Sequence, residues 1–105
     1  SANAPAHPTL ADIRVQGSQV RLCWKASPAP DLVGYNVYRL GYPGYDEYVQ
    51  VSARQTDLCF TEDYSPSGYF DFRLYTVTAV NAAPLRGGNA GQTSGERREV
   101  TAGHA

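Results

Sequence analysis

The stretch Val33-Gly-Tyr-Asn-Val-Tyr-Arg-Leu40 (VGYNVYRL) has the clearest β-strand pattern in the chain. It is rich in β-branched and aromatic residues, which fit a pleated, half-buried surface. Just upstream, Ser27-Pro-Ala-Pro-Asp31 breaks any regular structure, because proline supplies no N–H and fixes φ. Just downstream, Gly41-Tyr-Pro-Gly44 predicts a turn. We therefore predict a strand over 33–40, bounded by a loop and a turn.

Strand signals of the same kind recur at short spacing on both sides of this segment. In Gln19–Trp24 the apolar and polar residues alternate, as expected of a strand with one buried face. No segment shows a capped helical pattern, so the sheets are expected to be antiparallel. About seven short strands in a chain of this length predict an all-β sandwich. The further predicted strands are Val15–Ser18, Gln19–Trp24, Glu47–Val51, Thr56–Thr61, Phe70–Val80 and Glu99–Thr101, with a long loop over Asn81–Gly95.

The composition limits the class of protein. The 105 residues suit one domain, with 1–8 interpreted as a linker remnant and 102–105 as a tail. Nine basic and ten acidic residues give a formal net charge of -1, which argues against a nucleic-acid binder that needs a basic stripe. No apolar run is long enough to span a bilayer, so we expect no membrane insertion.

Three motifs, in order along the chain, resemble those of bacterial fibronectin type III domains. Trp24 lies near the end of the second predicted strand and precedes a proline-containing loop. Gly34–Arg39 (GYNVYR) is similar to the third-strand signature, and Val77–Asn81 (VTAVN) to the sixth-strand signature. The resemblance covers 9–101. It implies a seven-stranded, immunoglobulin-like antiparallel sandwich with strands A, B and E facing C, C′, F and G. It also implies a core between the sheets that includes Trp24, Tyr35, Val37, Val77 and Ala79.

One position departs from the family pattern. The family places a tyrosine four residues before the valine of the sixth strand, and that position here is Arg73. Either Tyr69 or Phe72 takes the place of this tyrosine through a bulge, or the corner that it forms is absent.

The resemblance also bears on the two cysteines, Cys23 and Cys59. An even number of cysteines in a small domain is compatible with one disulfide. The family places their strands, B and E, side by side, and both cysteines have the outward parity. A bridge there requires the close, non-hydrogen-bonded type of antiparallel pair. The alternative is two unpaired thiols.

No pattern in the chain indicates catalysis, a metal site or a cofactor. The two histidines, His7 and His104, lie in the terminal segments, so the folded part has no histidine for a nucleophilic triad. The adjacent carboxylates Asp46-Glu47 and Glu62-Asp63 are interpreted as charged turn residues. A meeting of Asp57, Glu62 and Asp63 at one end of the sandwich is the weaker alternative.

We therefore predict a non-catalytic structural or protein-interaction module, a spacer or adhesion domain of a larger extracellular, cell-surface or periplasmic protein. Its partners would be neighbouring domains of the same chain or another protein, and the isolated domain is expected to be a monomer. The alternative is a carbohydrate-binding accessory domain of a polysaccharide-degrading enzyme. In that case Tyr42, Tyr45 and Tyr48 would stack on sugar rings, since tyrosine offers rigid apolar area with a polar tip.

Overall fold

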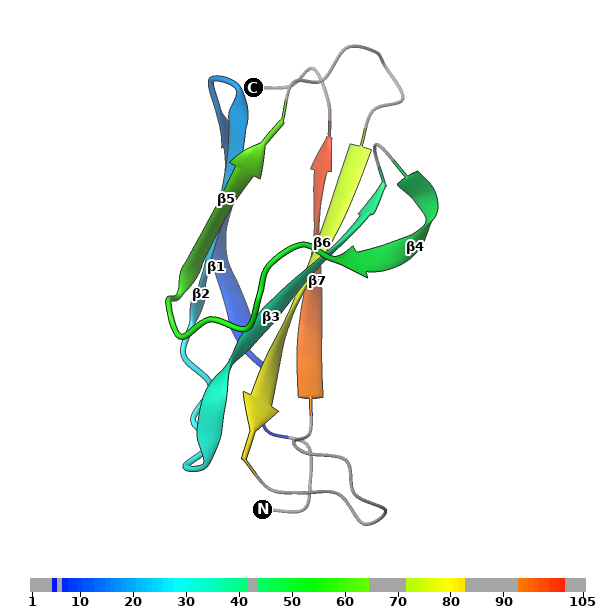
Figure 1. The fold of residues 1–105 in the computed structure, drawn as a ribbon. Helices are drawn as coiled ribbons and strands as arrows, with labels where there is room; N and C mark the ends of the chain where they lie inside the picture. Colours follow the sequence, from blue (N-terminus) through cyan, green and yellow to red (C-terminus); the bar gives the residue numbers. More distant parts are fainter. Residues whose placement is uncertain (1–4, 6, 42–43, 65–71, 83–92, 102–105) are drawn as a thin grey trace.

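The computed structural model describes 5, 7–41, 44–64, 72–82 and 93–101, with the side chains of 44–46, 72 and 93–101 outside the description. Within these residues the regular structure is entirely β, in two antiparallel sheets that pack face to face (Figure 1). The three-stranded sheet has the order β1-β2-β5 and the four-stranded sheet has the order β4-β3-β6-β7. Their bounds are β1 Thr9–Gln16, β2 Gln19–Lys25, β3 Leu32–Gly41, β4 Gly44–Gln50, β5 Cys59–Asp63, β6 Phe72–Asn81 and β7 Thr93–Thr101.

The first predicted strand, Val15–Ser18, was placed wrongly. Strand β1 begins at Thr9, and Gly17 and Ser18 form the two-residue turn that joins it to β2. Gly17 has a φ of 59° whereas Ser18 has no positive φ, which is the pattern of a type II′ hairpin turn. The turn holds Gln16 opposite Gln19 and so sets the register of the β1–β2 pair.

The last strand is longer than predicted, and β5 starts later. Strand β7 pairs with β6 from Thr101 opposite Phe72 to Thr93 opposite Val80, so the predicted loop over Asn81–Gly95 extends too far. The segment 93–98 has little apolar alternation, and its strand conformation follows from the ladder with β6. The strand predicted over Thr56–Thr61 corresponds to β5, which begins only at Cys59. Residues 56–58 belong to the connection before it.

The core lies between the two sheets, as expected. All five predicted core residues are buried. Trp24 has the largest side chain of the five, and only 3% of its surface is exposed. The rings of Trp24 and Tyr35 meet edge to face with their centroids 5.6 Å apart, which joins β2 of one sheet to β3 of the other. The rest of the buried hydrophobic cluster comprises Leu10, Val20, Leu22, Tyr64 and Tyr75.

The connection between β4 and β5 closes one long side of the sandwich. Gln55 exchanges two backbone hydrogen bonds with Tyr35 of β3, with N···O distances of 2.7 and 2.9 Å. Gly34 makes this approach possible, because a Cβ at that position would lie 2.9 Å from both Arg54 Cγ and the Gln55 carbonyl oxygen. Further along, the Leu58 carbonyl accepts a hydrogen bond from the Trp24 N–H, so the segment passes from one sheet to the other.

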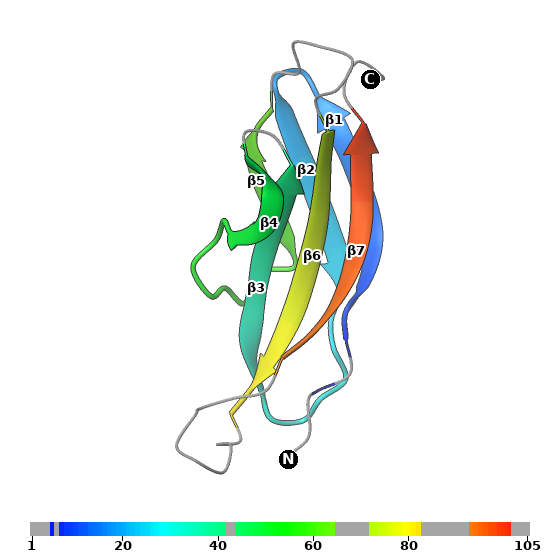
Figure 2. The same cartoon turned by 90° about the vertical axis from the view of Figure 1, so that its right-hand side faces the viewer.

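The domain is elongated, with principal extents of 45 × 25 × 17 Å. Thr9 is paired with Lys25 at the end of β2, whereas Thr101 is paired with Phe72 at the start of β6. In Figure 1, β1 starts towards the end of the sandwich where N is marked, and β7 finishes towards the end where C is marked. Strands β1 and β7 lie beside each other along one side (Figure 2). The described chain thus enters at one end of the sandwich and leaves at the other.

Candidate functional site

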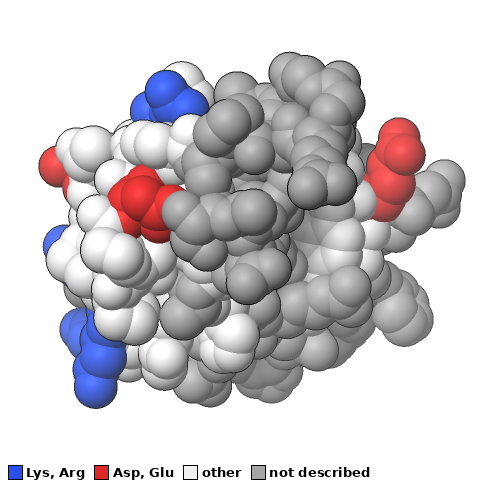
Figure 3. Space-filling view, turned by 90° about the horizontal axis from the view of Figure 1, so that it is seen from below, with Lys and Arg blue, Asp and Glu red and all other residues white. Residues whose placement is uncertain are grey.

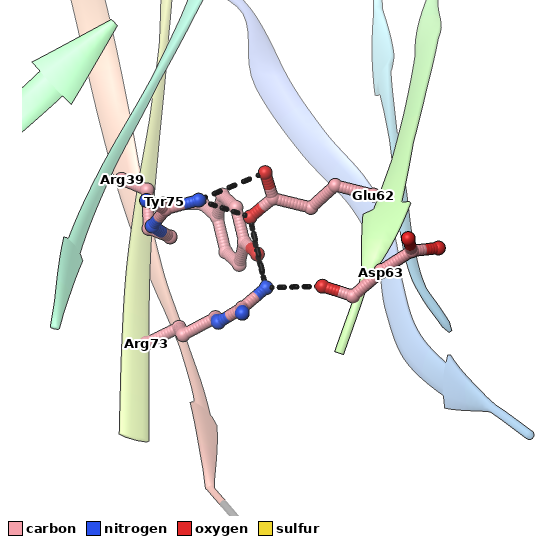
Figure 4. A network of polar contacts seen from close by, with 5 residues as sticks. All are labelled: Arg39, Glu62, Asp63, Arg73 and Tyr75. Carbon is pink, nitrogen blue, oxygen red and sulfur yellow. Dashed lines mark hydrogen bonds and ion pairs between the residues drawn. The ribbon is translucent and has the colours of Figure 1, made fainter. Parts of the chain in front are cut away.

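A partly buried group of polar side chains, three of them charged, connects the two sheets near the start of β6; we call Arg39, Glu62, Arg73 and Tyr75 the inter-sheet cluster (Figure 4). Glu62 comes from β5, while the other three come from β3 and β6 of the facing sheet. Arg39 Nη1 donates to both Glu62 oxygens at 3.0 Å. Glu62 Oε1 also accepts from Arg73 Nη1 at 2.9 Å and from the Tyr75 hydroxyl at 2.6 Å. One carboxylate therefore holds three donors from the opposite sheet.

Arg73 is the most deeply buried charge of the cluster, with 5% of its surface exposed. Its Nη1 also donates to the backbone carbonyl of Asp63 at 2.9 Å. Its guanidinium carbon lies 4.4 Å from the centroid of the Tyr64 ring, which is itself buried. The resemblance implies a tyrosine at this position. Arg73 is found there instead, and it lies over the Tyr64 ring and forms an ion pair with Glu62 of β5. Tyr69 and the side chain of Phe72 lie outside the described residues, so their expected role in this corner stays a prediction.

The electrostatics of the cluster suit a structural tie and not acid–base chemistry. Burial, and then the hydrogen bond to Glu62, raise the pKa of Tyr75 well above its usual range, so its hydroxyl stays neutral. Both Glu62 oxygens already accept from guanidinium groups, and the carboxylate side chain is only 15% exposed. Charge-assisted bonds of this kind are shorter and stronger than neutral ones. The cluster therefore holds β5 against β3 and β6.

The interpretation of Glu62-Asp63 as charged turn residues was wrong, because both belong to β5 and Glu62 points between the sheets. The pair Asp46-Glu47 likewise lies in β4. Strand parity could have revealed the cluster. Arg39 follows Tyr35 and Val37 at two-residue spacing, and Arg73 precedes Tyr75 at the same spacing. Opposite charges on the inward parity of three strands were the available signal.

The second feature is the Cys23–Cys59 disulfide, which is present in the structure. The two residues are directly opposed in the β2–β5 ladder. The hydrogen bond from the Trp24 N–H to the Leu58 carbonyl shows that they form a non-hydrogen-bonded pair, the type that the prediction required. Both cysteines are half-buried on the outer face of the three-stranded sheet, and Arg21 Nη2 lies 3.4 Å from Cys59 Sγ.

Removal of this bridge is expected to lower the free energy of unfolding without changing the fold. The sequence separation is 36 residues, and the chain-entropy model gives about 3–4 kcal/mol for a loop of that length. The measurement is urea unfolding of the Cys23→Ser/Cys59→Ser variant beside the oxidised wild type. Equal unfolding midpoints in the two proteins would contradict the expectation.

The tyrosines proposed as a sugar platform lie mostly outside the description. Tyr42 is not among the described residues, and of Tyr45 only the backbone is described, in β4. Tyr48, also in β4, has a half-buried side chain. Whether the three rings share one exposed strip therefore stays a prediction.

An open apolar hollow of about 260 Å³ lies between the start of β3 and the connection before β5. Its walls include Leu32, Val33 and Tyr35 from β3 and Thr56 and Leu58 from the connection. Its wall is almost wholly apolar, and it is smaller than most small-molecule sites. The hollow therefore offers apolar contact and no convergent set of polar groups.

The described residues hold no group of three or more histidine, cysteine, aspartate or glutamate side chains that could bind a metal ion. Within the same residues no helix is long and apolar enough to cross a membrane. Seen from the end where β2 passes to β3, the described basic and acidic side chains lie at separate points and not in one patch (Figure 3). Neither the protein-family models nor the curated proteins compared with this chain give a match.

Proposed function

We propose that this chain is a non-catalytic spacer of the fibronectin type III kind, set between other domains of a larger secreted or surface protein. The observation that carries the proposal is the position of its ends. Strand β1 starts towards one end of a body 45 Å long and β7 finishes towards the other, so domains joined before and after it would be held apart along that axis.

The sheet order supports the assignment to this family. The arrangement β1-β2-β5 facing β4-β3-β6-β7 is the one that the sequence resemblance implies for strands A, B, E and C′, C, F, G. The burial of Trp24, Tyr35 and Val77 in one interface agrees with it. The step from this fold to a spacer role is an analogy, since one fold serves many functions.

Two further features suit a module that must keep its shape outside the cell. Disulfides persist in oxidising compartments such as the periplasm or the extracellular space. The inter-sheet cluster joins the sheets at the end opposite to the Trp24–Tyr35 contact, so both halves of the sandwich are fastened. No observation on the described residues favours the polysaccharide-binding alternative.

The test is a tandem of two copies of the chain, compared with one copy by small-angle X-ray scattering. A spacer with its ends at opposite poles predicts a maximum dimension close to twice that of a single copy. A tandem whose maximum dimension is nearly that of one copy would mean that the modules fold back side by side. That result would reject the spacer role while leaving the sandwich fold untouched.

A further inference from the structure

The two sulfurs of the Cys23–Cys59 bridge have different electrostatic surroundings. Across the ladder, Cys23 is opposed on its other side by Asp12 of β1. Cys59 lies on the edge strand β5, and its Sγ is contacted by the guanidinium of Arg21 at 3.4 Å. The carboxylate of Asp12 is itself paired with Arg14, whose Nε lies 2.8 Å from Asp12 Oδ2. The difference between the two sulfurs is therefore the guanidinium beside Cys59.

This difference decides which sulfur leaves when the bridge is attacked. A thiolate forms more readily next to arginine, and the thiol that forms the better thiolate leaves faster in thiol–disulfide exchange. Arg21 stabilises a developing negative charge on Cys59 Sγ, the sulfur that its guanidinium contacts. Attack is thus directed to Cys23, with Cys59 as the leaving group.

The folded domain allows this reaction without unfolding. Both cysteines are partly exposed on the outer face of the sheet, on the side away from the core. The strands that they join are also held by the backbone ladder from Gln19 opposite Asp63 to Cys23 opposite Cys59. When the sulfur–sulfur bond breaks, this ladder keeps the two strands together.

We propose that Cys23 is a site of reversible S-thiolation by a low-molecular-weight thiol in the folded domain. The thiolate of the small thiol attacks Cys23 Sγ and forms a new sulfur–sulfur bond with it. The Cys23–Cys59 bond breaks, and its electron pair goes to Cys59 Sγ, which is released as a thiolate beside Arg21. The reverse attack by Cys59 on Cys23 restores the bridge and returns the small thiol.

The experiment uses reduced glutathione in excess over the oxidised protein, a quench with N-ethylmaleimide, and peptide mapping by mass spectrometry. We expect most singly modified molecules to carry glutathione on Cys23 and maleimide on Cys59. Arg21→Gln should bring the two possible products close to equal amounts and lower the second-order rate constant about threefold at neutral pH. Arg21→Lys, which keeps the charge, should restore much of the preference for Cys23.

Lys25→Gln is the matched control, because Lys25 is also an exposed cation two residues from Cys23 on β2. It should leave both the site of modification and the rate constant unchanged. Glutathione found mainly on Cys59, or equal behaviour of the Arg21→Gln and Lys25→Gln variants, would overturn the proposal. So would a rate that stops rising with glutathione concentration at the rate of global unfolding, because exchange would then need the unfolded chain.

Discussion

Replacement of Trp24 by alanine is expected to lower the free energy of unfolding by about 3–5 kcal/mol. The indole is 3% exposed and packs edge to face on Tyr35, so its removal leaves a void between the sheets and strips one side of a buried tyrosine. Domains of this size have a total stability of about 5–15 kcal/mol, so the loss is a large part of the whole. The measurement is urea unfolding followed by far-UV circular dichroism, since Trp24 is the only tryptophan of the chain.

Two further variants make the result specific to the buried ring. Trp24→Phe keeps an aromatic ring in the site and should lose clearly less than Trp24→Ala. Val49→Ala removes apolar atoms from a side chain that is 43% exposed, and a change within about 0.5 kcal/mol is expected there. If Trp24→Ala were no more destabilising than Val49→Ala, Trp24 would not be a core residue and the sandwich packing described above would be wrong.

The central strands were predictable because one face of each is buried. The prediction of 33–40 differs from β3, Leu32–Gly41, by one residue at each end. Alternation identified the inward parity of β2, and the resemblance implied a core position for Val77 and Ala79 of β6. Trp24, Val77 and Ala79 are all buried. Burial of every second residue imposes a periodic pattern, and a periodic pattern can be read without an alignment.

Strands at the edge of a sheet were harder to predict. Strand β1 begins at Thr9, where the burial pattern is irregular and the register shifts between Leu10 and Asp12. Strand β7 contains Gly95 and a run of charged residues, so its propensity is low and its ladder with β6 defines it. In both cases pairing with a neighbouring strand decides the conformation, and the residues of the strand itself do not indicate that pairing.

The candidate sites divide in the same way. The sequence resemblance and strand parity together led to the Cys23–Cys59 pair. The inter-sheet cluster was missed because charged residues are usually exposed, and Glu62 was therefore interpreted as a turn residue. Glu62 has the inward parity of β5, although a charged side chain between two sheets is unfavourable unless an opposite charge compensates it. Arg39 and Arg73 lie on the facing sheet, where they compensate the charge of Glu62.

Replacement of Glu62 by glutamine is expected to cost about 3–5 kcal/mol, because breaking a buried ion pair by removing one partner leaves the other charge uncompensated. Here two guanidinium groups lose the same carboxylate, and the side chain of Arg73 is only 6% exposed. The Tyr75 hydroxyl also loses a charged acceptor at 2.6 Å. Urea unfolding of the Glu62→Gln variant measures the loss.

The neighbouring carboxylate offers a matched control for the loss of negative charge. Asp63 is exposed, and Arg73 uses only its backbone carbonyl, so Asp63→Asn should change the stability by less than about 0.5 kcal/mol. A large loss for Glu62→Gln beside a small one for Asp63→Asn would locate the effect in the contact between the sheets and not in the net charge. Similar small losses for both would mean that β5 is held by the β2 ladder and the disulfide alone, with the cluster contributing little. The difference between the two variants therefore measures how far one acid on β5 secures it to the facing sheet.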